Sequence, residues 1–339
     1  MSLEFRHIAH AYGQVQALQD VSFTAPAGEI TCLLGASGCG KSTLLGLAAG
    51  LLSVQQGEIV LGGEVLADAQ RCPPPEARPV GLVFQDGALF PHMTLAANVA
   101  FGLPKARRSE AENWLARVGL AGMGARYPHE LSGGQQQRAA LARAMAPEPH
   151  VLLMDEPFAS VDIVLRRRLR RECRILLREA GATVVLVTHD PAEALDIGDR
   201  IAVMEAGRIV QFGTPEELYE TPATAAVGAI FGGAQVIAGA SREEGLDTPF
   251  GLWPLGALVG ELPDVAAFDL LVQADRLVPV ADVRGCRVRD VHPMGARSRV
   301  LLESGDGATI TVETALPVDP AKSYSVLPDP ESVRAFARS

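Results

Sequence analysis

Ile30-Thr-Cys-Leu-Leu34, followed by Gly35-Ala-Ser-Gly-Cys-Gly-Lys-Ser-Thr43, is the stretch that decides how this chain is organised. The first five residues predict a buried strand. The spacing G-x-x-x-x-G-K-S then predicts a loop whose backbone N–H groups turn inward on a phosphate at the start of a helix. Lys41 is placed to reach the β- and γ-phosphates of a triphosphate, and the Ser42 hydroxyl to bind Mg²⁺. The alternative is a glycine-rich turn with a chance lysine, so other stretches must agree.

Size and composition limit the possible classes of protein. The 339 residues exceed one typical domain, which predicts a main domain and a smaller appendage. No apolar run approaches the roughly 20 residues of a membrane helix, and Met1 to His10 lacks the apolar core of a signal peptide. We therefore expect a cytoplasmic protein that reaches a membrane only through a partner. The net charge of −10 argues against a nucleic-acid surface, and the basic run Arg166 to Arg171 predicts a solvated helix face.

The five cysteines are widely separated and form no C-x-x-C pair, so the sequence indicates neither a metal site nor a disulfide framework. Cys39 differs from the others because it lies in the phosphate loop at a helix N-terminus, where a thiol tends to be reactive. We expect its alkylation to block nucleotide binding.

The chain before and after the phosphate loop reads as strands joined by turns. Residues 3–9 and 15–23 predict antiparallel strands, with Tyr12 between them either stacking on an adenine ring or packing in the core. Residues 57–65 predict a hairpin with a turn at Gly62-Gly63, and the proline-rich stretch 72–79 predicts a surface loop.

Polar side chains follow three apolar strands. Residues 80–84 end at Gln85, residues 151–154 end at Asp155-Glu156, and residues 184–187 lead to His189. Ligands of open α/β sheets bind at the carboxyl ends of the strands. Two adjacent carboxylates are costly there unless a cation or a proton transfer uses them. Asp155 fits the magnesium shell and Glu156 fits a general base for water. Gln85 and His189 each have an ordinary structural reading as well.

Between these strands, residues 86–150 predict helices and turns. Residues 90–95 gather apolar groups that form either a docking patch for another protein or a satellite core. Leu131-Ser132-Gly133-Gly134-Gln135 opens a helix over 136–146. Ser132 is a good N-cap, and the paired glycines expose N–H groups at the positive helix end, so this is a second anion site.

The last part of the chain changes character. Helix 191–195, strand 200–205, hairpin 207–212 and helix 215–219 complete the first unit, and residues 228–239 predict a small-residue linker. Segments 283–291, 297–303 and 308–313, with a turn at 304–307, predict a small all-β barrel.

Taken together, the motifs resemble the nucleotide-binding subunit of an ATP-binding cassette (ABC) transporter over about Met1 to Phe231. The resemblance implies these roles: Walker A at Gly35, Ser37, Gly38, Cys39, Gly40, Lys41, Ser42 and Thr43; a Q-loop at Gln85; the signature at Ser132, Gly133, Gly134 and Gln135; Walker B at Asp155 and Glu156; a D-loop at Asp162; a switch at His189; and adenine stacking by Tyr12. Glu156, His189 and Gln85 would be the catalytic residues, and Ser42, Gln85 and Asp155 the magnesium ligands. ATP and Mg²⁺ would be the cofactors.

The resemblance also implies the architecture. It is an α/β P-loop NTPase cassette with a mixed sheet over 1–232, with a helical subdomain at about 86–150. A small all-β OB-like domain of the TOBE type would follow over 236–339. Two copies would pair head to tail, each ATP lying between Lys41 of one copy and Ser132 to Gln135 of the other. That arrangement would explain the second anion site.

Among importers, the stretches Pro79 to Asp86 and Tyr127 to Glu130 most resemble the ferric-iron group, with polyamine, thiamine, molybdate and sulfate systems as alternatives. Permease subunits would dock near Gln85 to Thr94 at the cytoplasmic face of the inner membrane. A periplasmic or extracellular binding protein would be an indirect partner. Two places depart from the family pattern: Val272 to Asp275 replaces Val-Arg-Pro-Glu, and Ala159 replaces the first serine of the D-loop.

Rival classes explain less of the chain. A kinase or GTPase has no reason for the Leu131 to Gln135 stretch or for His189. A DNA-maintenance cassette would separate Lys41 from Ser132 by a long coiled coil, and a translation-type cassette protein would normally carry two cassettes. A non-transport cassette ATPase is thus the less favoured alternative.

Overall fold

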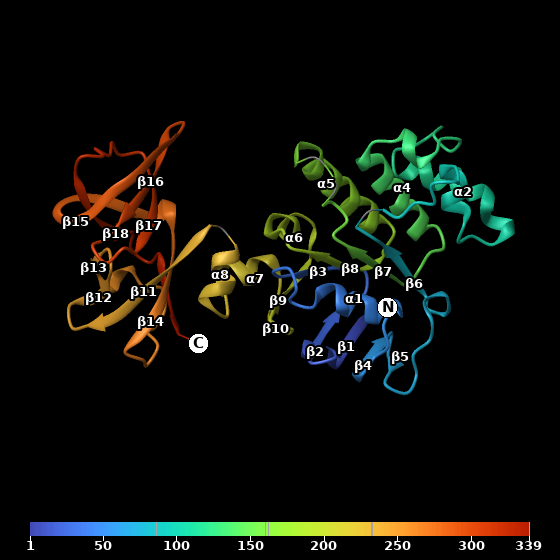
Figure 1. Cartoon of the computed structure of the whole chain (residues 1–339), viewed down its shortest axis with the longest axis horizontal. Helices are drawn as coiled ribbons and strands as arrows, with labels where there is room; N and C mark the ends of the chain where they lie inside the picture. The colour runs from blue at the N-terminus through green and yellow to red at the C-terminus, as the bar shows by residue number, and fades with distance from the viewer. Residues whose placement is uncertain (86, 160, 162, 232, 339) are drawn as a thin grey trace. The chain divides into compact units, whose positions relative to one another are not determined.

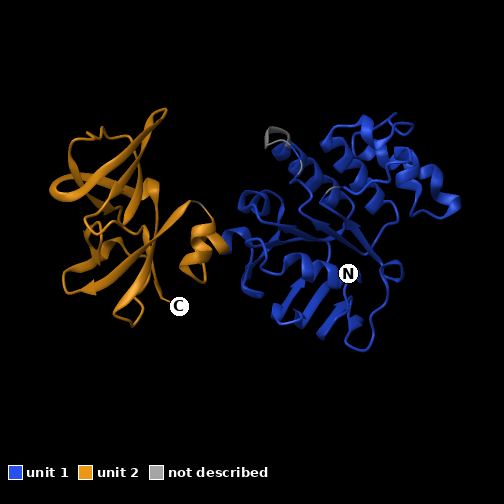
Figure 2. Ribbon diagram, in the orientation of Figure 1, with its two compact units in different colours: residues 1–217 blue, residues 218–339 orange. Residues whose placement is uncertain are grey.

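The computed structural model describes residues 1–85, 87–159, 161, 163–231 and 233–338. The chain divides into two compact units, Met1–Glu217 and Leu218–Ser339 (Figure 2). Each unit has its own hydrophobic core. The predicted domain boundary at residues 232–236 stays a prediction.

Unit 1 begins with a four-stranded antiparallel sheet in the order β2-β1-β4-β5 (Figure 1). The strands are β1 (Leu3–Tyr12), β2 (Val15–Ala25), β4 (Gln56–Leu61) and β5 (Glu64–Asp68). The predicted turn at Gly62-Gly63 joins β4 to β5. Both glycines have positive φ, a conformation that other residues rarely adopt.

The second sheet of unit 1 has six strands in the order β10-β9-β3-β8-β7-β6. Its strands are β3 (Ile30–Leu34), β6 (Val80–Val83), β7 (Val151–Asp155), β8 (Thr183–Thr188), β9 (Arg200–Glu205) and β10 (Arg208–Gly213). All neighbours are parallel except β10 and β9. The parallel strands are apolar on both faces because both faces are covered.

Helix α1 (Lys41–Ala49) packs in the core shared by the two sheets. From Leu44 onward its sequence is apolar on all sides, and Leu44, Leu45 and Leu47 are all buried, as expected for a helix segment without a solvated face. Side chains alternate along β7 and β8, so Val151, Leu153, Val185 and Val187 belong to this core. The helix that starts on the phosphate loop is therefore held between two layers.

Helices α5 (Ile163–Glu179) and α6 (Pro191–Ile197) lie beside the six-stranded sheet (Figure 1). The prediction of a solvated face over Arg166 to Arg171 is wrong for Arg170. Its side chain is 6% exposed and forms ion pairs with Asp190, Glu193 and Asp196 of α6 and its cap. Periodicity shows that a helix is charged on a face, but it cannot show that another helix brings acids to that face.

Between β6 and β7, the described residues form helices α2 (Leu95–Ala100), α3 (Ala111–Arg117) and α4 (Gly133–Met145). Short 3₁₀ turns at Lys105–Glu110 and Pro128–Glu130 separate them. Leu95 is fully buried, whereas Phe90 is half-buried and packs on the exposed Phe101, with ring centroids 4.6 Å apart. The apolar segment 90–95 thus contributes to a small local core and also reaches the surface.

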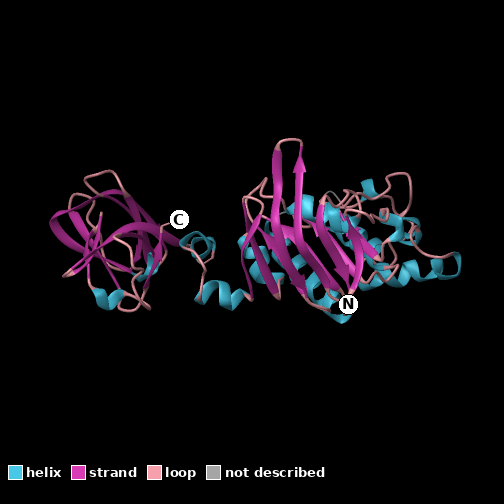
Figure 3. Ribbon diagram, turned by 90° about the horizontal axis from the view of Figure 1, so that it is seen from below, coloured by secondary structure: helices cyan, strands magenta, loops and turns pink. Residues whose placement is uncertain are grey.

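Unit 2 starts with the C-terminal part of helix α7 (Pro215–Glu220) and helix α8 (Ala225–Ile230), and is otherwise β structure. One sheet has the order β13-β12-β11-β14-β19 and the other β17-β16-β15-β18. The strands are β11 (Ala234–Arg242), β12 (Gly245–Thr248), β13 (Gly251–Trp253), β14 (Ala267–Gln273), β15 (Leu277–Met294), β16 (Arg297–Glu303), β17 (Thr309–Thr314), β18 (Ser323–Pro328) and β19 (Val333–Ala337). The two sheets curl around one core (Figure 3), which confirms the expected all-β region.

Trp253 is the largest fully buried side chain of unit 2. Its indole Nε1 donates to the Val326 carbonyl oxygen at 2.7 Å, which ties β13 of one sheet to β18 of the other.

Two local predictions are corrected. The predicted linker 228–239 instead contains the end of α8 and most of β11; its small residues pack closely, so small size did not mean flexibility. The proline-rich loop 72–79 contains a 3₁₀ turn, Pro75–Ala77, and a buried arginine, Arg78.

Candidate functional site

The phosphate loop runs from Gly35 to Gly40, between the end of β3 and the first residue of α1. Gly40 is the N-cap, with φ 106°, and a Cβ there would lie 2.5 Å from the Ala17 carbonyl oxygen. No other residue fits this position without moving β2. The glycine spacing read in the sequence is therefore a requirement of the backbone.

Lys41 is 95% hidden from solvent, and its ammonium group lies inside the loop. Nζ donates hydrogen bonds to the carbonyl oxygens of Gly35 at 2.8 Å and Ala36 at 2.9 Å, and it lies 3.7 Å from the Cys39 sulfur. A buried cation held only by carbonyl oxygens is available to an anion that enters the loop. Cys39 is itself buried, so an alkylating reagent should reach it more slowly than the exposed Cys72.

Asp155 ends β7 and lies opposite the phosphate loop. The Ser42 hydroxyl donates to its Oδ1 at 3.3 Å. Burial raises the pKa of the Asp155 carboxyl, as does the neighbouring Glu156, while the Ser42 hydrogen bond and Lys41 oppose the shift. A divalent cation would relieve that burial cost, so the donors fit Mg²⁺. In the described part of the chain no cluster of three or more His, Cys, Asp or Glu could hold a metal. Mg²⁺ would thus draw its remaining ligands from phosphates and water, as this ion normally does.

Glu156 has an unusual backbone, with φ 43°. Its N–H donates to the Val187 carbonyl oxygen of β8 at 3.0 Å, and its Oε1 lies 3.0 Å from Nδ1 of His189. The Glu156 side chain is 22% exposed and that of His189 is 55% exposed. The two strand ends therefore present a paired carboxylate and imidazole to solvent, beside the magnesium donors.

Tyr12 lies beside the start of α1, whereas the structure shows no hydrogen bond between Gln85 and the phosphate loop among the described residues. Gln85 follows β6 and is exposed. Tyr12 is 50% exposed, which excludes its packing in the core. Its hydroxyl lies 3.4 Å from the Thr43 hydroxyl, and its ring packs edge-on against His10 with centroids 4.9 Å apart.

At the predicted second anion site the structure has the expected Ser132 cap, but helix α4 begins at Gly133, three residues earlier than predicted. Ser132 caps α4, its hydroxyl accepting from the Gln135 N–H at 3.4 Å while the Gln135 side chain accepts from the Ser132 N–H at 3.0 Å. Ser132 and Gly133 are exposed, and Gly134 is buried. Among the described residues, no hydrogen bond or ion pair links this cap to the phosphate loop. Asp162 lies outside the described residues.

Sequence reasoning missed two arginines that hold the site's framework. The Arg78 guanidinium is buried and donates to the Leu47 and Ala48 carbonyl oxygens at 2.8 and 2.9 Å, at the C-terminal end of α1. The Arg166 Nη2 donates to the carbonyl oxygens of Ala159 and Val161 at 3.2 and 3.0 Å, on the loop that follows Glu156. Arg78 binds carbonyl groups that are far away in the sequence, and Arg166 binds carbonyl groups of an irregular loop. No local sequence pattern predicts such contacts.

Comparisons with known proteins agree with this geometry. The family model described as ABC transporter matches residues 18–159. The Fe(3+) ions import ATP-binding protein FbpC of Pseudomonas fluorescens is 49% identical over 250 residues, which cover 72% of this chain and 70% of that protein. The Sulfate/thiosulfate import ATP-binding protein CysA 2 of Chromobacterium violaceum is 43% identical over 312 residues, covering 88% of this chain and 83% of that protein.

A solved structure is similar as well. It is the dimeric post-hydrolysis state of the ATP-binding cassette MJ0796 bound to ADP and Pi, with a TM-score of 0.54 and 29% identity. The match covers 62% of this chain and 98% of that one. The phosphate-loop geometry, the sheet that carries it and a 49% identity that covers 70% of a relative point to one conclusion. The chain belongs to the ATP-binding subunits of ABC transporters and is an ATPase.

Proposed function

We propose that the chain powers an importer for ferric iron, and that two copies bind ATP head to tail between the Lys41 loop of one copy and Ser132 to Gln135 of the other. The observation that carries the proposal is the gathering of Lys41, Ser42, Asp155 and Glu156 at one sheet edge. Among the residues that the structure describes, no hydrogen bond or ion pair joins Ser132 to Gln135 to this group. The dimeric state of the similar cassette supports the pairing.

The phosphate loop would bind the nucleotide. Lys41 would exchange its bonds to the Gly35 and Ala36 carbonyl oxygens for phosphate oxygens, which are stronger acceptors because they are charged. Gly38 and Gly40, both with positive φ, leave the loop free of side chains that would obstruct its N–H groups. Ser37 and Cys39 of the loop and Thr43 in the first turn of α1 would contribute backbone N–H groups, and Tyr12 would stack on the adenine ring.

The hydrolytic step would depend on Glu156. Its carboxylate would take a proton from the attacking water. His189 would orient that carboxylate through the 3.0 Å contact and would position the γ-phosphate. Ser42, Asp155 and Gln85 would hold Mg²⁺, which would neutralise phosphate charge when bound. Asp162 belongs to the same dimer contact by its position in the sequence.

Replacement of Ser132 by Arg tests the head-to-tail arrangement. The bulky cation blocks the partner's phosphates but touches nothing in its own Lys41 loop. We expect ATP binding by the separate chain to stay within about twofold, while hydrolysis falls at least about 100-fold. Ser109→Arg, an exposed position in the Lys105–Glu110 turn, is the matched control and should change neither quantity. Near-normal hydrolysis by Ser132→Arg would contradict a shared site.

The surface from Gln85 to Thr94 would receive the permease subunits. Exposed or half-buried aromatic side chains, Phe84, Phe90 and Phe101, lie on or beside this segment, as is common where proteins dock. The protein would then sit at the cytoplasmic face of the inner membrane, with a periplasmic or extracellular binding protein as an indirect partner. No helix in the described part of the chain has the length and apolar character that a membrane crossing requires.

The cargo is inferred from relatives. Several iron-import proteins are 47–50% identical to this chain. Sulfate is the second candidate, because the sulfate/thiosulfate relative matches more of the chain, including most of unit 2. Deleting the gene and measuring uptake of ⁵⁵Fe(III) and ³⁵S-sulfate separates them: loss of iron uptake alone supports the proposal, and loss of sulfate uptake alone contradicts it.

The boundary between the cassette and the C-terminal domain is proposed at residues 232–236, where α8 has ended and β11 begins. The C-terminal domain would be an OB-like module of the TOBE type, a reading that its two curled sheets support.

A further inference from the structure

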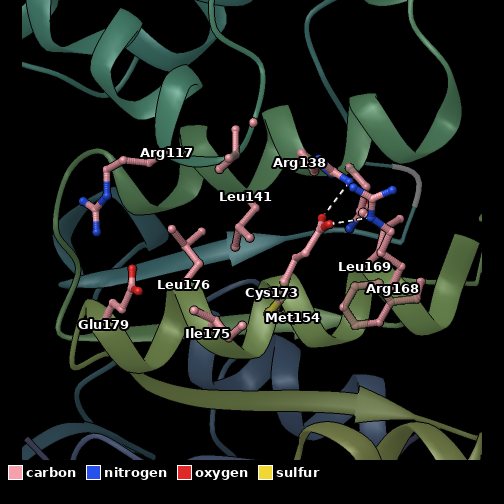
Figure 4. Close-up of a pocket in the computed structure, with 15 residues that line it drawn as sticks. Arg117, Arg138, Leu141, Met154, Arg168, Leu169, Cys173, Ile175, Leu176 and Glu179 are labelled. Carbon is pink, nitrogen blue, oxygen red and sulfur yellow. Dashed lines mark hydrogen bonds and ion pairs between the residues drawn. The ribbon is translucent and has the colours of Figure 1, made fainter.

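A pocket of about 470 Å³ in unit 1 has no role in the function described so far. It lies between the end of α3, helices α4 and α5, and strand β7 (Figure 4). Its volume falls in the range of small-molecule sites. Its middle is apolar, formed mainly by Leu141, Met154, Leu169 and Leu176.

Charged groups stand at both ends of the pocket. At one end, Arg138 and Arg168 both bind the Glu172 carboxylate, each at 2.7 Å, so these charges are satisfied. At the other end, the Arg117 guanidinium lies over the Trp114 ring, 4.2 Å from its centroid, and Glu179 lies at the same end (Figure 4). In the part of the chain that the structure describes, Arg117 forms no ion pair. It is thus the cation that the pocket can offer to a ligand.

Gln137 provides an independent sign of a ligand. Its side chain lines the pocket and is 95% hidden from solvent. Its Nε2 has no hydrogen-bond acceptor among the described residues. Buried amide donors are nearly always paired, because an unpaired one loses its bonds to water. An acceptor supplied by a ligand would satisfy it.

We propose that this pocket binds a small organic anion with an apolar body, a carboxylate and a neutral hydrogen-bond acceptor. Arg117 binds the carboxylate, Leu141 and Leu176 pack on the apolar body, and Gln137 donates to the acceptor. Glu179 repels the anion by its like charge. The affinity for the anion therefore depends on attraction by Arg117 and repulsion by Glu179.

The site is placed to affect turnover, a consequence that rests on the proposed function. Met154 immediately precedes Asp155 on β7, and Leu141 lies on the helix that Ser132 caps. A ligand that touches both fixes the position of the Ser132 cap relative to the Asp155 strand within one chain, and in the head-to-tail dimer these two elements serve different ATP sites. Because we expect turnover to need movement of α4 relative to this strand, we expect occupancy to slow hydrolysis.

Isothermal titration calorimetry of the full chain without nucleotide tests binding, with N-octanoylglycine as the anionic probe and its methyl ester as the neutral one. We expect one site for the acid and at least about tenfold weaker binding of the ester. Arg117→Gln should weaken binding of the acid by a similar factor, and Glu179→Gln should tighten it. Arg242→Gln, an exposed arginine of unit 2, is the matched control and should change nothing.

Equal binding of acid and ester, an unchanged affinity for Arg117→Gln, or weaker binding by Glu179→Gln would each overturn the proposal. Arg117 and Glu179 both lie at the pocket rim, so we expect both variants to fold. The two substitutions should change the affinity for the acid in opposite directions. In a separate assay, the acid should slow ATP hydrolysis by the wild type but not by Arg117→Gln. Binding without any change in hydrolysis would overturn the regulatory consequence alone. A chain without ATPase activity would overturn the proposed function and leave the calorimetric result intact.

Discussion

The two units place their charged side chains in opposite ways. In unit 1, Arg170 is buried among three acids, and adjacent carboxylates end a buried strand. In unit 2, Arg287 and Arg289 reach Glu303, and Arg299 reaches Glu313, across neighbouring strands, with the arginine side chains more than half exposed. Exposed pairs add little to stability, whereas a broken buried pair leaves a charge without water. Unit 1 should therefore respond strongly to charge substitutions, and unit 2 weakly.

The largest expected effect is at Arg170. Arg170→Met leaves Asp190, Glu193 and Asp196 without their shared cation, and we expect unit 1 to lose about 3–5 kcal/mol of unfolding free energy. Each unit contains one tryptophan, Trp114 or Trp253. In a Trp253→Phe background, the change in tryptophan fluorescence during urea unfolding therefore reports on unit 1 alone. A loss below about 1 kcal/mol would remove the contrast between the units.

Next is Glu156 at the sheet edge. Glu156→Gln removes the proton acceptor but preserves shape, so we expect ATP hydrolysis to fall about 100-fold or more while ATP still binds. Glu313→Gln, in an exposed pair of unit 2, is the matched control and should hydrolyse ATP normally. Near-normal turnover by Glu156→Gln would show that another group accepts the proton.

The third effect is a pH dependence at Glu193. Burial raises the pKa of this carboxyl from 4.5 to about 7, against the opposing effects of Arg170 and Thr188, with Asp190 adding to the shift. Between these values the folded chain keeps a proton that the unfolded chain has lost. Stability should therefore fall as pH rises from about 4.5 to 7.

Glu193→Gln should remove that fall and stabilise unit 1 by about 1–3 kcal/mol at pH 8, with little change at pH 4. The measurement is the urea concentration at the unfolding midpoint between pH 4 and pH 8. It is monitored by Trp114 fluorescence in the Trp253→Phe background. Parallel curves for variant and wild type would refute the assignment to Glu193.

The smallest effect is expected in unit 2. Arg299→Met breaks the 2.7 Å ion pair between Arg299 and Glu313. The Arg299 side chain is 51% exposed. Because water replaces the lost contact, unit 2 should lose no more than about 1 kcal/mol. Trp253 fluorescence in a Trp114→Phe background measures it. A loss as large as that at Arg170 would mean that exposure does not explain the difference.

The local parts of this structure were predictable from the sequence. The phosphate loop, the Ser132 cap and the strand ends at Asp155 and His189 depend on residues within a few positions of one another, where spacing and backbone demands are visible. The curled β region also followed from strand patterns.

Contacts made across the fold were not predictable. Arg78 binds carbonyls some thirty positions away, and Arg170 meets acids from another helix. Neither is visible in a run of residues, because burial of a charge depends on which elements pack together. Likewise, the small residues of 228–239 suggested flexibility until their packing in α8 and β11 was known.

The backbone of Glu156 has a consequence for how this protein can change. A left-handed φ costs an ordinary residue about 1–3 kcal/mol, and glycine is largely free of that cost. A library selected for heat resistance alone should accumulate glycine at this position and yield robust proteins that no longer split ATP. Selection for ATP hydrolysis must therefore remove glycine at position 156 each time it arises. At this position the residue that favours stability differs from the residue that favours activity.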